Sequence, residues 1–121
     1  LFINAARGMF TVMRSDDGEG LLGAERNSTH RERIEIASTD QATLIHDWMS
    51  ELLFLHTTKK KYFTEFKIDE LDETHLKAVA KGFTITDEDE HLLMDIKAVT
   101  YHGLEIKKSS DGYTAQIIFD I

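Results

Sequence analysis

The stretch QATLIHDWMSELLFLH, residues 41–56, is the strongest structural signal in this sequence. Asp47 and Glu51 fall on its polar face, and the preceding Ser38-Thr39-Asp40 supplies an N-cap. The pattern predicts a long amphipathic helix whose apolar face lies in the core of the fold. Its apolar side chains recur every three or four residues: Leu44, Ile45, Trp48, Met49, Leu52, Leu53 and Leu55.

The chain around this helix carries mostly strand signals. A second apolar period at helical spacing runs from Phe2 to Met13, and because no capping residue precedes it, we expect the sequence to begin inside this helix. Residues 57–61 are predicted as a connection, and 21–30 and 86–91 as loops. Strands are predicted at 31–37, 62–71, 75–85, 96–107 and 113–119, the last two joined by a Gly-containing turn. We therefore expect one α+β domain, residues 1–121, with two main helices packed on a mixed or antiparallel sheet.

Composition excludes several classes of protein. The 121 residues contain no cysteine, which removes thiol nucleophiles, zinc fingers and iron–sulfur sites. The formal charge of −8 leaves no broad basic footprint for nucleic acid, although a local contact is compatible with it. No apolar run is long enough to span a membrane and no secretory leader is visible, so we expect a soluble, cytoplasmic protein.

The sequence contains little that resembles a catalytic motif. The six histidines form no His-Glu-x-x-His motif and no i, i+4 pair on one helix, so they are interpreted as solvated or as satisfied by hydrogen bonds. No Gly-x-Ser-x-Gly motif or phosphate-binding glycine loop is present. The acidic run 87–90 fails as an EF-hand because Leu92 stands where the loop needs glycine. Asp16, Asp17 and Glu19 indicate a turn, with a cation site as the alternative.

The C-terminal residues are more informative. Asp120 closes the last predicted strand, and Ile121 carries the α-carboxylate if the chain ends there. Two neighbouring carboxylates repel each other, and a hard divalent cation relieves that repulsion. The alternative is a pair of solvated acidic groups.

Two C-terminal segments, 96–106 (IKAVTYHGLEI) and 117–121 (IIFDI), resemble the archease family. Residues 4–10 and 47–55 are similar to the first and the long helix of that family, and His91 also matches its pattern. The likeness is collinear over essentially the whole chain. One departure is Gly82-Phe83, where many relatives have an acidic residue after the glycine. The proline-free loop 86–93 is another, so we transfer no role from it.

The resemblance implies an accessory protein and not an enzyme. Archeases assist the RtcB-type tRNA-splicing RNA ligase, promoting its guanylylation and multiple turnover, so tRNA would be met only through the ligase. The family's metal site, usually assigned to calcium, combines a His-Thr-Ala-Asp motif on the first strand with a C-terminal Asp-Ile. Asp120 and Ile121 match the second half. The first half and its N-terminal strand are expected to lie upstream of this sequence, which leaves the site incomplete.

Lys97 matches a lysine that is functionally important in the family, where it would meet the ligase or its nucleotide; a solvent-facing strand lysine is the alternative. Tyr101 and His102 are hallmarks of the same motif, and packing explains them equally well.

Two other functions stay open. A chaperone-like protein-binding module would use the metal structurally, whereas a small metal-dependent hydrolase would need at least three convergent ligands.

Overall fold

The computed structural model describes residues 1–13, 30–90 and 93–121. Both long helices, all five strands and the turn between the last two strands are confirmed, with ends that differ by a few residues. The loop predicted before residue 30, with Asp16, Asp17 and Glu19, lies outside the described residues, as does His91. The elements are α1 (Phe2–Met13), β1 (His30–Ala37), α3 (Gln41–Lys59), β2 (Lys61–Leu71), β3 (His75–Thr84), α4 (Asp87–Glu90), β4 (Ala98–Ser109) and β5 (Gly112–Asp120).

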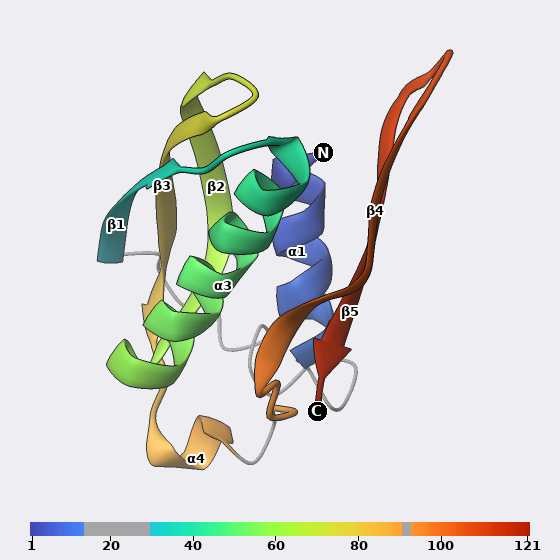
Figure 1. The fold of residues 1–121 in the computed structure, drawn as a ribbon. Helices are drawn as coiled ribbons and strands as arrows, with labels where there is room; N and C mark the ends of the chain where they lie inside the picture. Colours follow the sequence, from blue (N-terminus) through green and yellow to red (C-terminus); the bar gives the residue numbers. More distant parts are fainter. Residues whose placement is uncertain (14–29, 91–92) are drawn as a thin grey trace.

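The strands of the described chain form two separate antiparallel sheets. One has the order β1–β3–β2, and the other is the β4–β5 hairpin. Helix α3 crosses one face of the three-stranded sheet, with α1 beside it, and the tip of the hairpin reaches away from both helices (Figure 1). The α+β class is therefore confirmed, and the described pairings are all antiparallel.

Helix α3 is the centre of the core, as its periodicity predicts. All seven side chains of the predicted stripe are buried. Asp40 caps the helix by accepting a hydrogen bond from the backbone N–H of Thr43 at 2.7 Å. Trp48 is fully buried and donates from its indole N–H to the carbonyl oxygen of Phe2 at 3.0 Å, which fastens α1 to α3. Helix α1 is fastened to the sheet by Tyr62, whose hydroxyl donates to the carbonyl oxygen of Phe10.

Two predictions around this core are wrong in detail. Residues 57–59 are the last turn of α3, which ends where Lys60 adopts a left-handed conformation with φ 56°. Glycine usually occupies that position, so a lysine there gave no sequence signal. The acidic residues 87–90, predicted as loop, form the short helix α4, which the Lys60–Glu90 ion pair joins to the end of α3.

The β4–β5 hairpin contains a large bulge. Thr100 pairs with Ile118, and the next described pair is Glu105 with Gln116, so Tyr101, His102, Gly103 and Leu104 together oppose Ile117 alone. Gly103 has φ +69°, which disfavours any side chain, and its carbonyl oxygen accepts a hydrogen bond from the Gln116 amide at 3.0 Å. None of the described helices is long and apolar enough to cross a membrane.

Candidate functional site at the end of the hairpin

The hairpin brings the predicted site residues together. Asp120 ends β5 opposite Ala98, and its carbonyl oxygen accepts a hydrogen bond from the backbone N–H of Lys97 at 2.6 Å. Residues 97 and 120 therefore lie side by side although 23 positions separate them in the sequence. Both side chains are exposed, and Ile121 is 68% exposed. In the described part of the chain, neither the Lys97 amine nor the Asp120 carboxylate has an ion-pair partner.

The described residues supply the right donor chemistry for a hard cation but too few ligands. Carboxylate oxygens suit calcium, which takes six to eight oxygen ligands. Within residues 1–13, 30–90 and 93–121, no group of three or more histidine, aspartate or glutamate side chains could hold a metal ion. Within the described residues, Asp120 therefore does not belong to a complete set of cation ligands. The same observation gives no support to a hydrolase, which needs three convergent ligands.

Tyr101 leaves the hairpin at the bulge and contacts the core helix. Its ring stacks on that of His46 in α3, with 3.6 Å between ring centroids. Its hydroxyl donates to Asp47 at 3.3 Å. The other named motif residue, His102, is exposed. The bulge therefore directs one hallmark side chain toward α3, which explains Tyr101 by packing, as the sequence alternative held.

His46 holds the hairpin from the other side. Its Nε2 lies 2.8 Å from the carbonyl oxygen of Val99 in β4, and its Nδ1 lies 3.1 Å from an oxygen of Asp47. Both neighbours are hydrogen-bond acceptors that an N–H of the ring can satisfy. The interpretation of His46 as a histidine satisfied by hydrogen bonds is confirmed, but its link to a distant strand gave no signal in the sequence.

The cluster formed by His46, Asp47 and Tyr101 favours a stable contact between α3 and β4 over acid–base chemistry. Burial alone would raise the pKa of Asp47, but the hydrogen bonds donated by Ser38, His46 and Tyr101 outweigh it and lower that pKa below its usual value. Burial and the nearby Asp47 carboxylate raise the pKa of Tyr101, so its hydroxyl stays a proton donor at neutral pH. The cluster therefore docks β4 on α3.

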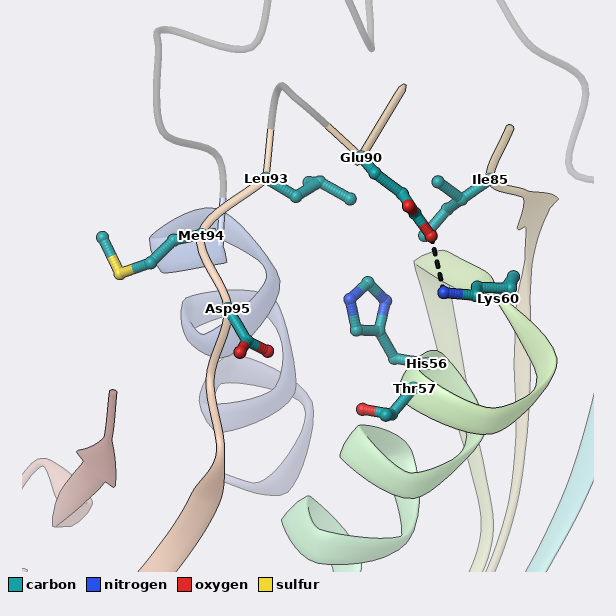
Figure 2. Close-up of a pocket in the computed structure, with 8 residues that line it drawn as sticks. All are labelled: His56, Thr57, Lys60, Ile85, Glu90, Leu93, Met94 and Asp95. Carbon is teal, nitrogen blue, oxygen red and sulfur yellow. Dashed lines mark hydrogen bonds and ion pairs between the residues drawn. The ribbon is translucent and has the colours of Figure 1, made fainter. Parts of the chain in front are cut away.

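A pocket of about 270 Å³ lies between the end of α3 and the segment that follows α4 (Figure 2). His56 projects into it, and its Nδ1–H donates to the carbonyl oxygen of Lys61 at 2.7 Å. Burial lowers the pKa of His56, so this ring is neutral at pH 7. At the rim Lys60 and Glu90 form an ion pair of 2.5 Å. Because these rim charges neutralise each other, the pocket gives no clear preference for a ligand.

Two long helices, a three-stranded antiparallel sheet and a C-terminal hairpin define a small α+β protein. Family comparison makes the class specific: the model of the archease protein family matches residues 1–121. The chain belongs to this family.

Individual relatives agree with that assignment. A protein archease from Methanothermobacter thermautotrophicus is 39% identical, over all of this chain and 83% of the relative. The archease of Methanosarcina acetivorans is 37% identical, over all of this chain and 81% of the relative. A solution structure of a Methanobacterium thermoautotrophicum protein superposes with a TM-score of 0.72 at 36% identity, over 99% of this chain and 82% of that one. A Thermotoga maritima archease, called a possible chaperone, shares the fold with a TM-score of 0.59 at 16% identity, over 98% of this chain and 79% of that one.

Proposed function

We propose that this protein is an accessory activator of an RtcB-type RNA ligase in cytoplasmic tRNA splicing. In this role it promotes ligase guanylylation and multiple turnover and catalyses no reaction of its own. The observation that carries the proposal is the exposed pair of Lys97 and Asp120, held side by side by the β4–β5 register at one end of the hairpin. Family membership supports it. The resemblance matches Asp120 to the family's metal site and Lys97 to a lysine that is functionally important in the family.

In this proposal Asp120 and the carboxylate of Ile121 hold a divalent cation, calcium by preference, together with a ligand outside the described residues. Hard oxygen donors favour calcium over softer metals. The cation would supply a fixed positive charge at the point of contact with the ligase. Lys97 adds a second, flexible positive charge beside it, suited to a phosphate or carboxylate group of the partner.

The test is multiple-turnover ligation of RNA ends by the cognate ligase, with and without this protein. We expect Asp120→Asn to abolish the stimulation while the circular dichroism spectrum and melting temperature stay unchanged. Asp111→Asn, in the exposed turn at the other end of the hairpin, is the matched control and should stimulate normally. Full stimulation by Asp120→Asn would refute the site.

Lys97 is tested in the same assay against a control lysine. Lys97→Gln should reduce stimulation on the order of tenfold, which corresponds to the loss of one charge-assisted hydrogen bond. Lys107→Gln changes another exposed lysine, in β4 and nearer the turn of the hairpin, and should have little effect. Equal losses in both variants would mean that only overall charge matters.

A chaperone-like module with a structural metal is the second candidate. It is supported by the exposed apolar side chains of the hairpin and its end, Tyr101, Tyr113, Ile118 and Ile121, and by the relative called a possible chaperone. Suppression of aggregation of an unrelated client protein, unaffected by Asp120→Asn, would favour this function over ligase activation.

A further inference from the structure

The three-stranded sheet has a second face, turned away from α3, whose charges differ from those of the protein as a whole. Side chains alternate along each strand, so residues next to the buried Ile34, Ala78 and Phe66 point outward. We define the cationic face as the outward side chains Arg31 and Arg33 of β1, Lys81 and Val79 of β3, and Lys67 of β2. These side chains carry four positive charges, and Glu65, which faces Lys81 across the β2–β3 pair, adds one negative charge. The face is therefore net positive in a protein of formal net charge −8.

The register places these cations against one another. Arg31 lies directly opposite Lys81, and Arg33 and Lys67 flank Val79 from its two sides. Like charges directly opposite each other destabilise a sheet. Such an arrangement costs stability in the free protein and is relieved when an anion binds.

Three of the four cations have no ion-pair partner in the described chain. Arg31, Arg33 and Lys81 make no ion pair there, even though Glu65 faces Lys81 across the β2–β3 pair. Lys67 has a loose ion pair of 3.7 Å with Asp69.

A lysine on the same side of the sheet provides an internal contrast. Lys77 pairs with both Glu35, at 3.8 Å, and Glu70, at 3.6 Å. The charge of Lys77 is therefore neutralised by its neighbours. The positive surface is thus confined to the part of the sheet around Arg31, Arg33 and Lys81.

We propose that the cationic face binds the phosphate backbone of a single-stranded RNA. Arg31 and Arg33 are two residues apart on one strand, roughly 6.8 Å along it, which is comparable to the spacing of successive phosphates in an extended nucleic acid strand. Guanidinium groups also match phosphate oxygens with paired hydrogen bonds.

The composition of this face favours nucleic acid over an acidic protein. Val79 is its single apolar member and is half-buried. Protein interfaces depend on buried aromatic or apolar anchors, which this flat charged face does not offer. A phosphate backbone needs only positive charge at a regular spacing. The choice of RNA over DNA rests on the proposed function.

The experiment measures binding of a fluorescent oligouridylate of about twelve nucleotides to the full chain, without ligase, as a function of salt. Arg31→Gln/Arg33→Gln should weaken binding on the order of tenfold at low salt and reduce the slope of log K against log salt by about 1.4. Lys107→Gln/Lys108→Gln removes the same charge from the hairpin, beside the exposed Tyr113, and should change affinity less than twofold. Both pairs are exposed, and thermal melting checks that each variant is folded.

Three results would overturn the inference: no binding of wild type at low salt, equal losses in the two double variants, or loss in the hairpin variant alone. Polyglutamate that competes with RNA at equal charge concentration would reassign the face to an acidic protein partner. None of these results bears on ligase stimulation through Asp120, because the binding assay contains no ligase. Failure of the proposed function would in turn leave the RNA-binding result standing.

Discussion

The body of the protein and its C-terminal hairpin are stabilised in different ways. Helices α1 and α3 and strands β1–β3 contribute almost all the buried apolar side chains of the described chain, whereas Val99 is the single one from β4 or β5. The hairpin is fastened by half-buried apolar side chains that pack against the core, together with the His46–Tyr101 stack and the hydrogen bonds to Asp47 and Val99. Lys97 and Asp120 thus lie on the more lightly anchored region, where local opening costs least.

The largest loss of stability is expected from a substitution at the centre of the core, in the body of the protein. Trp48→Ala should lower the free energy of unfolding by about 3–5 kcal/mol, since it leaves a cavity and removes the hydrogen bond to the Phe2 carbonyl oxygen. Urea denaturation followed by circular dichroism measures the change. The control is Phe54→Ala on the same helix, 57% exposed, which should stay within about 0.5 kcal/mol of wild type. Equal effects of the two variants would contradict the placement of the core.

A smaller loss is expected where α1 meets the sheet. Tyr62→Phe keeps the buried ring but leaves the Phe10 carbonyl oxygen without the hydroxyl that donates to it at 2.8 Å. We expect a loss of about 1–3 kcal/mol in the same urea experiment. Tyr113→Phe, in the exposed part of the hairpin, should be neutral. A neutral Tyr62→Phe would mean that the hydroxyl does not fasten α1.

His56 should make the body sensitive to mild acid. Burial lowers the pKa of His56 in the folded state below 6.5, the usual value for histidine. As the pH falls, the unfolded chain therefore takes up the proton before the folded protein does. Stability from this group is complete above pH 6.5 and is lost as the pH falls from there toward the folded-state pKa. The melting temperature should therefore drop between pH 7.5 and 5.5, and less so in His56→Asn. A parallel decline in both proteins would exclude His56 as the cause.

The smallest effect is expected at the hairpin and should remain local. Tyr101→Phe keeps the stack on His46 but removes the hydroxyl bond to Asp47, which we expect to cost about 0.5–1 kcal/mol because the bond is long and exposed. Hydrogen exchange should become faster at amides of β4 and β5 while those of β2 and β3 keep their rates. Faster exchange throughout the protein would show that hairpin and body unfold as one unit. Tyr113→Phe again serves as the control.

The same contrast explains what could be predicted from the sequence. Helix α3 and the strands of the body follow apolar periodicity, which short segments carry by themselves. Helix α4 consists of four acidic residues and has no apolar periodicity. Because its position depends on the ion pair with Lys60, the local sequence did not predict it. The end of α3 at Lys59 was missed for a similar reason, because a left-handed lysine replaces the usual glycine.

The arrangement of the candidate site residues could not be predicted from the sequence. Family resemblance selected Lys97, Asp120 and Ile121, yet a hairpin continued without interruption from its turn would place Asp120 opposite Tyr101. The bulge shifts the register by three residues and so puts Asp120 opposite Ala98, beside Lys97. Gly103 was the one hint of this irregularity in the sequence. His46 and Asp47 were unassigned because their contacts join segments more than 50 positions apart.

Because of the bulge between Thr100 and Glu105, the number of residues in this segment affects the hairpin register more than the identity of most of its side chains does. Removing one residue from it would slip all of the pairing beyond it by one position and turn Val99 away from His46. The same slip would separate Lys97 from Asp120. Insertions and deletions within residues 101–104 should therefore be tolerated far less well than substitutions at His102, whose side chain is exposed. The number of residues in this segment therefore sets both the attachment of the hairpin to α3 and the position of Lys97 relative to Asp120.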